Sequence, residues 1–82
     1  MKVSNILPLS SLQLHEKARV IAFTAGCNEA FRRRLMSMGV LPNSEVTLTR
    51  VAPLADPMEI RVRNYRLVIR SADARHIQVE RL

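Results

Sequence analysis

Apolar and polar side chains alternate with a period of two over much of the chain, which is typical of half-buried β-strands. The alternation is clearest where Val46 and Leu48 interleave with threonines, and it recurs where Ile60 and Val62 interleave with charged residues. Bounded by turn residues, these stretches predict strands over 18–23, 45–51, 58–63, 66–70 and 77–79. The chain is therefore expected to be mainly β.

One stretch has a helical period instead. Its apolar residues stand four and then three positions apart, at Phe31, Leu35 and Met38. This spacing places them on one face of a helix, with Arg33 nearly opposite. Asn28 is a suitable N-cap and Gly39 a suitable residue just past the last turn, so we expect one short α-helix over 29–38 with the apolar stripe buried.

Turn residues divide the remaining segments. Pro8 and the serines after it interrupt any regular element over 3–14, so this segment is expected to wrap over the core. Two prolines stiffen the segment 52–57, which is expected to form the tip of a long hairpin. Ser71 is expected to cap a single helical turn over 72–75.

Five short strands and one helix do not make a stable flat sheet, because such a sheet leaves exposed edges and an open apolar face. A small, partly open barrel is the economical alternative. SH3-like and OB-like barrels both fit the strand count, and the short turn before the last strand favours the SH3-like form. We expect a single domain over 1–82, since a chain of this length cannot divide its core.

Composition narrows the class of protein. The net charge of +6 comes from 13 basic residues against 7 acidic ones, and most of the basic residues are arginine, which suits contacts with carboxylates and phosphates. A single cysteine excludes an internal disulfide and fits a reducing compartment. Without a leader pattern or an apolar run of about 18 residues, a cytoplasmic location is expected.

The polar residues give little support for catalysis or metal binding. No nucleophile stands at a recognisable spacing from a base, and no glycine-rich phosphate loop is present, so we expect neither an enzyme nor a cofactor. His15, Cys27 and His76 are weak metal candidates, because they lie far apart in the sequence. A buried, apolar role for Cys27 and surface or turn positions for the histidines are the preferred interpretations.

The arginines are the stronger signal. They form a triplet over 32–34 and a second set along the predicted hairpin, at Arg61, Arg63, Arg66 and Arg70. Three interpretations stay open: a solvated face, a contact surface for acidic protein groups, or a nucleic-acid surface. The last is disfavoured because the chain has only three aromatic residues for base stacking. Leu54, at the apex of the stiff tip, either serves docking or folds back onto its own hairpin.

In order along the chain, a group of short motifs resembles the signature of the FeoA family. The motifs are Arg33-Arg34-Leu35, Met38-Gly39-Val40 with Pro42, and the hairpin segment 51–57, followed by 67–70, Ala74 and 77–79. The resemblance covers about residues 9–80. It implies an SH3-like barrel and a cytosolic accessory role in bacterial ferrous-iron uptake, in partnership with the GTPase-containing permease FeoB.

The resemblance leads to a specific hypothesis about contacts. The helix and the tip are expected to bind FeoB through Arg32, Arg33, Met36, Leu54 and Asp56. We expect no nucleic-acid partner, no membrane insertion, and a monomer with at most weak self-association. The alternative is a basic SH3-like domain that binds nucleic acid or senses a metal.

Three positions depart from the family pattern. His15, Asn43 and Ala55 stand where the family usually has glycine. Asparagine tolerates a positive φ, so Asn43 is a mild change, whereas alanine at 55 would be strained if its φ were positive. The details of docking by the tip are the part of the hypothesis that these departures affect.

Overall fold

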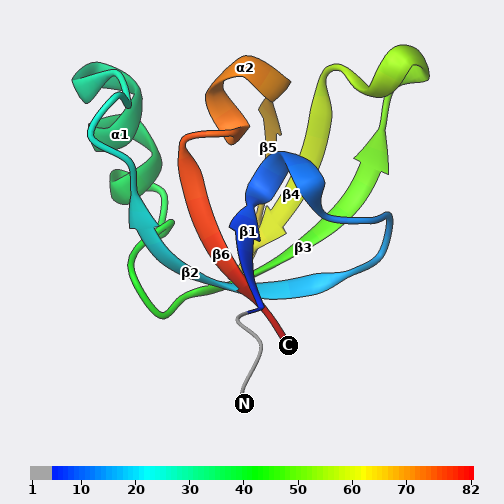
Figure 1. The fold of residues 1–82 in the computed structure, drawn as a ribbon, viewed down its shortest axis with the longest axis horizontal. Helices are drawn as coiled ribbons and strands as arrows, with labels where there is room; N and C mark the ends of the chain where they lie inside the picture. The colour runs from blue at the N-terminus through cyan, green and yellow to red at the C-terminus, as the bar shows by residue number, and fades with distance from the viewer. Residues whose placement is uncertain (1–4) are drawn as a thin grey trace.

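One antiparallel sheet curled around an apolar core forms the framework of the protein (Figure 1). The computed structural model describes residues 5–82, the side chain of Ala55 excepted. Its strands are β1 (Ile6–Pro8), β2 (Lys17–Phe23), β3 (Glu45–Val51), β4 (Met58–Val62), β5 (Tyr65–Ile69) and β6 (Ile77–Arg81). They lie in the order β1-β6-β2-β3-β4-β5, and within the described residues β1 and β5 do not pair, so the barrel is partly open, as predicted.

The strand β1 was not expected. Pro8 lies within it and pairs with Gln78 of β6, whereas the sequence had suggested that this proline prevents any regular element. An edge strand tolerates proline because the missing N–H can be on the unpaired side. The prediction of a wrapping segment holds for the 3-10 helix η1 (Leu9–Ser11), where Leu9 is fully buried.

The helix α1 (Glu29–Ser37) begins and ends close to its predicted bounds. The side-chain oxygen of Asn28 accepts a hydrogen bond from the backbone N–H of Phe31 at 3.0 Å, which is the N-cap interaction expected. Gly39, with φ 99°, ends the helix in a conformation that favours glycine. The buried stripe is narrower than predicted, because only Leu35 is fully buried while Phe31 and Met38 are half-buried.

The short helix α2 (Ser71–Ala74) begins one residue earlier than predicted. Its N-cap is Arg70, which makes no side-chain cap, and Ser71 is its first residue. The expected capping role of Ser71 is therefore wrong. The backbone N–H of Ser71 donates instead to the carboxylate of Asp56, 15 residues earlier in the chain.

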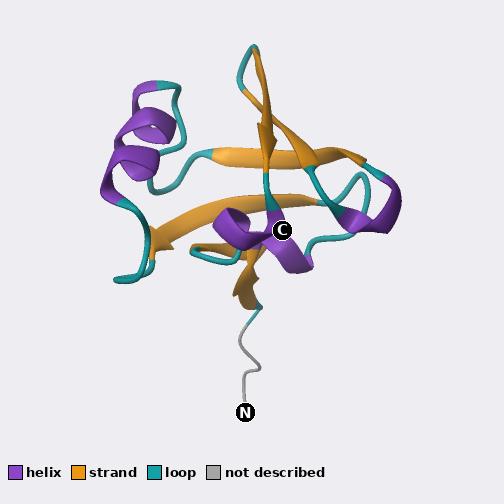
Figure 2. Ribbon diagram, turned by 90° about the horizontal axis from the view of Figure 1, so that it is seen from above, coloured by secondary structure: helices purple, strands orange, loops and turns teal. Residues whose placement is uncertain are grey.

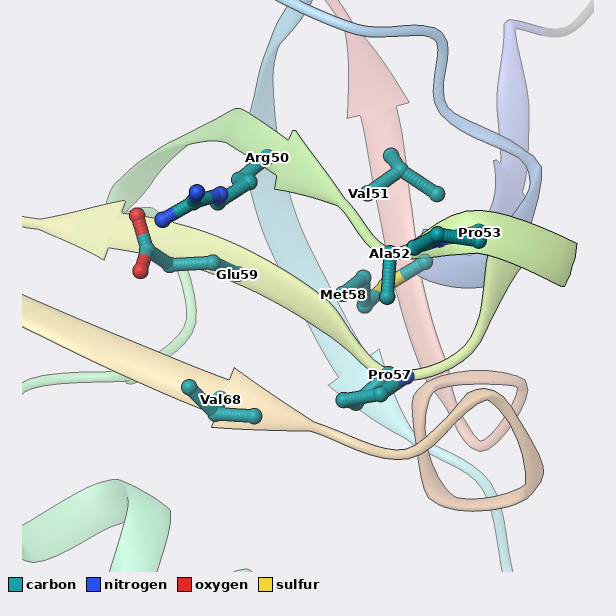
Figure 3. Close-up of a pocket in the computed structure, with 8 residues that line it drawn as sticks. All are labelled: Arg50, Val51, Ala52, Pro53, Pro57, Met58, Glu59 and Val68. Carbon is teal, nitrogen blue, oxygen red and sulfur yellow. The ribbon is translucent and has the colours of Figure 1, made fainter.

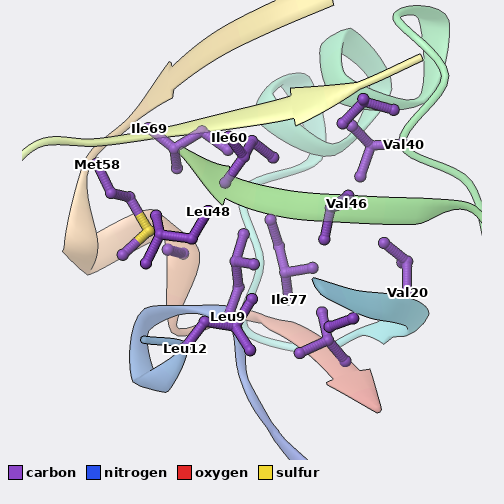
Figure 4. Packing of buried hydrophobic residues seen from close by; sticks show 14 of the residues in the cluster. Leu9, Leu12, Val20, Val40, Val46, Leu48, Met58, Ile60, Ile69 and Ile77 are labelled. Carbon is purple, nitrogen blue, oxygen red and sulfur yellow. The ribbon is translucent and has the colours of Figure 1, made fainter. Parts of the chain in front are cut away.

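The core fills the space inside the curled sheet (Figure 4). Alternate residues of the strands point inward, as Val46 and Leu48 of β3 do, and they meet apolar residues from η1, α1 and α2. The buried set is Leu9, Leu12, Ala18, Val20, Leu35, Val40, Val46, Leu48, Met58, Ile60, Val62, Ile69, Ala74, Ile77 and Val79. This is the half-buried alternation that the sequence pattern predicts.

The residues proposed to contact a partner lie on two elements outside the sheet, the helix α1 and the hairpin tip. The helix α1 and the 3-10 helix η2 (Pro53–Ala55), which forms the hairpin tip, lie toward opposite ends of the 37 Å long axis (Figures 1 and 2). The two ends of the described chain are neighbours, since the backbone N–H of Arg81 donates to the carbonyl of Asn5 at 3.1 Å. They lie on the side of the barrel away from α1, α2 and η2 (Figure 1).

Candidate docking surfaces

The residues proposed from the sequence as partner contacts fall into two separate groups. Arg32, Arg33 and Met36 are on α1, whereas Leu54 and Asp56 are at the tip. Because α1 and the tip are toward opposite ends of the molecule, the fold does not bring the two groups into one patch (Figure 2).

On α1, the two arginines differ in their surroundings. Arg32 donates from its guanidinium to Glu29 at 2.7 Å, one turn earlier, so its charge is already partnered. Arg33 is exposed to solvent. Met36 lines a groove of about 270 Å³ between the end of α1 and the β4–β5 turn, together with Ser37, Met38, Gly39, Leu41, Arg63 and Tyr65. Beside Met36, the helix therefore offers an exposed Arg33 that takes part in none of the ion pairs within residues 5–82, next to a groove lined by both polar and apolar residues.

At the tip, Leu54 is 98% exposed, which rules out the interpretation that it folds back onto its hairpin. Its φ is 68°, in the left-handed region that a leucine adopts at a cost of about 1–2 kcal/mol. Glycine would adopt the same conformation without strain. An exposed leucine on a strained backbone is thus unfavourable for folding, and such residues gather at functional sites.

Asp56 has a structural role at the base of the tip. One of its carboxylate oxygens accepts the hydrogen bond from the backbone N–H of Ser71 at 2.8 Å. That N–H belongs to the first turn of α2 and has no partner within the helix itself. Asp56 therefore links the tip to α2 and sets how Leu54 is presented.

A groove of about 510 Å³ lies beneath the tip (Figure 3). Arg50 and Glu59 are at one end of it, and Pro53 and Pro57 are at the other (Figure 3). Its complete lining is Arg50, Val51, Ala52, Pro53, Pro57, Met58, Glu59 and Val68. Val68 is 63% exposed although it is apolar, so the groove opens onto the outer surface of the sheet.

The outer surface of the sheet beside this groove is positively charged. Arg61 of β4 and Arg66 of β5 stand directly opposite each other in the antiparallel register. Both are exposed, and neither takes part in an ion pair within residues 5–82, where the pairs are Arg19–Glu80, Arg32–Glu29 and Arg81–Glu16. The sequence indicates these arginines but not their pairing, because the corner expected at 64–65 would place Arg63 opposite Arg66, whereas the turn is at 63–64.

The weak metal candidates are not brought together. His15 is exposed, with φ 71°, and Nδ1 of His76 is hydrogen bonded to the hydroxyl of Thr24 at 2.8 Å. Cys27 is half-buried rather than buried, and burial raises the pKa of its thiol above the ordinary value, which disfavours the thiolate that metals bind. Within residues 5–82 no three His, Cys, Asp or Glu side chains form a possible metal site.

The backbone conformation explains why the family has glycine at two of the three positions where this chain does not. His15 and Asn43 have φ values of 71° and 75°, so these positions do require the left-handed conformation that glycine adopts freely. The side chain at each is accommodated with φ positive, and for asparagine this is common.

None of the described helices, from residue 5 onward, is long and apolar enough to cross a membrane.

Known proteins resemble the chain in sequence and in structure. The family model for the FeoA domain matches residues 7–81. The Fe(2+) transport protein A/Fe(2+) transporter FeoB fusion protein of Porphyromonas gingivalis is 31% identical over 68 residues. The match covers 83% of this chain but only 8% of the fusion protein.

Solved structures agree with this match. The FeoA protein from Chlorobium tepidum superposes with a TM-score of 0.85 and 34% identity, over 93% of this chain and 70% of that one. The zinc complex of FeoA from Stenotrophomonas maltophilia, described as a prokaryotic SH3 domain protein, gives a TM-score of 0.79 and 29% identity, over 90% and 89% of the two chains. The SH3-like barrel is confirmed, and the chain belongs to the FeoA domain family, which is associated with ferrous-iron transport.

Proposed function

We propose that this protein is a cytoplasmic accessory protein of ferrous-iron uptake that acts by binding a FeoB-type transporter. The observation that supports this most directly is the P. gingivalis relative, in which a homologous segment and FeoB belong to one polypeptide. Domains that are fused in one organism commonly work together when they are separate chains. The protein would act through contacts rather than by catalysing a reaction.

The geometry of the tip supports a docking role. Leu54 is almost fully exposed, and it adopts a positive φ that would suit glycine better. Neither feature helps the isolated protein to fold, but both are explained if the leucine is buried in a partner. Asp56 then contributes by orienting the tip through its bond to Ser71, rather than by direct contact alone.

The helix α1 offers a second contact. Arg33 has no ion-pair partner within residues 5–82, and Met36 lines the groove near the end of the helix. Methionine adapts its shape to different apolar partners, and arginine makes forked contacts with carboxylates. Since α1 and the tip are far apart, the transporter would contact the domain at two separate points.

The test is an affinity measurement between the tagged full chain and the detergent-solubilised FeoB-type transporter of the same organism. It should be made at moderate salt, with and without a GTP analogue. We expect the wild-type chain to bind and Leu54→Asp to bind much more weakly. Leu82→Asp is the matched control, because Leu82 is 55% exposed and lies at the chain end away from the tip.

Two results would overturn the proposal. The transporter role is wrong if the wild-type chain does not bind in any nucleotide state. The assignment of Leu54 and α1 is wrong if binding occurs but survives both Leu54→Asp and Arg33→Glu. Affinity for a duplex or an RNA that falls steeply with salt would instead favour the nucleic-acid alternative.

A further inference from the structure

We propose that the outer surface of β3, β4 and β5 binds an extended, acidic segment of the transporter, with one aliphatic side chain of that segment in the groove beneath the tip. We call this surface the cationic face and define it by Arg50, Glu59, Arg61, Arg66 and Val68. The inference rests on the proposed function and specifies where, and through what chemistry, the partner binds.

The register of the β4–β5 hairpin places two positive charges side by side. Arg61 and Arg66 are directly opposite across β4 and β5, so their side chains leave the sheet on the same face, a few ångströms apart at Cβ. Like charges in this arrangement destabilise a sheet. The same row continues through Thr47 of β3 to Lys17 of β2, which adds a third cation. An anion bound to this row would offset the repulsion.

The acidic residues of the protein do not neutralise this row. Glu16, Glu29 and Glu80 form the ion pairs of the described residues with arginines elsewhere. Asp56 accepts a hydrogen bond from the start of α2. Glu59 is the acidic member of the cationic face, and it accepts a hydrogen bond from the hydroxyl of Thr49 at 3.0 Å. The remaining two, Glu45 and Asp73, take part in none of the ion pairs within residues 5–82. The positive charge of Arg61 and Arg66 is thus available to a partner.

The groove identifies the partner as a protein segment. Glu59 and Val68 are directly opposite each other, and they form the next row of the same face after Arg61 and Arg66. Val68 is therefore shared between the cationic face and the groove. The groove's other apolar lining is aliphatic or proline, and none of the described residues that line it is aromatic. Bases of single-stranded nucleic acid stack on aromatic side chains, so this lining suits an aliphatic side chain better.

The rows Arg61–Arg66 and Glu59–Val68 also predict how far apart the contacting residues of the bound segment are. Neighbouring rows on one face of a strand are two residues apart, or about 7 Å. An extended peptide has the same period, so an Asp or Glu placed against Arg61 and Arg66 brings its second neighbour to Val68. We therefore expect the transporter segment to carry an acidic residue and an aliphatic residue separated by one position.

The experiment compares two double variants with the same change in net charge, both in the full chain. Arg61→Gln with Arg66→Gln alters the cationic face, whereas Arg19→Gln with Arg75→Gln alters arginines of β2 and of the segment after α2, outside the surfaces proposed to dock. The probe is the detergent-solubilised FeoB-type transporter at moderate salt. We expect the first pair to weaken binding about tenfold or more and the second to leave it near the wild-type value.

A third variant tests the groove. Val68→Asp introduces a charge at an exposed position opposite Glu59, so we expect a loss of stability of roughly 0.2–1 kcal/mol without unfolding, which thermal unfolding verifies. We expect it to weaken binding at least as much as the arginine pair, because it removes the aliphatic contact and repels the acidic segment. The control is Val68→Ile, which keeps the aliphatic surface and should bind normally.

The outcomes separate this inference from the proposed function. If the wild type binds and both double variants lose affinity equally, or neither does, the cationic face is not the site and the proposed function stands. If the wild type fails to bind, the proposed function fails and this inference with it. If a fluorescent single-stranded RNA binds the wild type but not the Arg61→Gln, Arg66→Gln variant, the face recognises phosphate rather than a protein segment.

Discussion

The carboxylate of Asp56 and the backbone N–H of Ser71 are joined by a hydrogen bond of 2.8 Å. Asp56 follows the tip helix η2, and Ser71 is the first residue of α2. The bond thereby connects a hairpin loop to a helix that comes 15 residues later. It satisfies one of the helix N–H groups that lack a partner within the helix and fixes the base of the tip.

Removing this bond should destabilise the protein and loosen the tip. We expect Asp56→Ala to lower the free energy of unfolding by about 1 kcal/mol, the usual effect of losing a helix cap. Asp56→Asn keeps an oxygen that accepts the bond, so it should retain most of the stability. Urea unfolding measures the stability, and hydrogen exchange at Ser71 measures the local effect. Equal loss in both variants would mean that the negative charge matters rather than the hydrogen bond.

Leu54→Gly should separate stability from binding. The substitution removes the strain of a positive φ, and it loses no buried apolar contact because Leu54 is 98% exposed. We therefore expect the free energy of unfolding to rise by about 1 kcal/mol. The gain is reduced by the greater flexibility of glycine in the unfolded chain. Binding to the transporter should fall at the same time. A variant that is more stable and binds equally well would show that the leucine has no docking role.

Arg66→Glu should also act in opposite directions on folding and on binding. It replaces a pair of like charges across β4 and β5 with an opposite-charge pair, which should stabilise the protein by roughly 0.2–1 kcal/mol. Because the charge of the cationic face is reduced, affinity for the transporter should drop. Thermal unfolding at low and high salt gives the first quantity, and the gain should shrink as salt is added. Lower stability at low salt would contradict the observed register.

Glu16 should make stability depend on acid pH. Hydrogen bonds from the backbone N–H of Gln13 and from Arg81 hold the pKa of the Glu16 carboxyl below its ordinary value of 4.5. The ionised carboxylate therefore stabilises the folded state above pH 4.5, and this contribution is lost as the pH falls through the lower, folded-state pKa.

The matching variant is Glu16→Gln. We expect it to be less stable than the wild type near neutral pH, and the difference to shrink as the pH falls below 4.5 and through the lowered folded-state pKa of Glu16, where the wild-type carboxylate becomes protonated. Urea unfolding midpoints over a series of pH values from neutral to acid are the measurement. A difference between variant and wild type that stays constant with pH would show that the loss comes from packing instead of charge.

The elements that the sequence predicted well are those set by local chemistry. The strand 45–51 has its observed bounds, because turn residues flank a stretch in which Val46 and Leu48 alternate with threonines. The helix over 29–37 differs by one residue, since Asn28 caps its first turn and Gly39 follows its last. Both features require only neighbouring residues to be recognised.

What the sequence did not reveal depends on contacts between distant segments. The strand containing Pro8 exists because β6, about 70 residues later, pairs with it. The role of Asp56 depends in the same way on where α2 begins. The opposition of Arg61 and Arg66 depends on a nearby feature, the two-residue turn 63–64. The predicted strands 58–63 and 66–70 shift this turn by one residue and would place Arg63 opposite Arg66 instead.

The bond between Arg81 and Asn5 has a consequence for how the domain can be combined with others. A domain attached through either end is anchored on one side of the barrel, and α1 and the tip, both on the opposite side, stay accessible (Figure 1). A copy tethered to its partner, as in the P. gingivalis fusion protein, experiences a local concentration in the millimolar range, so weak contacts suffice. A copy that diffuses freely occupies its partner in proportion to its abundance, and its level in the cell then becomes a means of control.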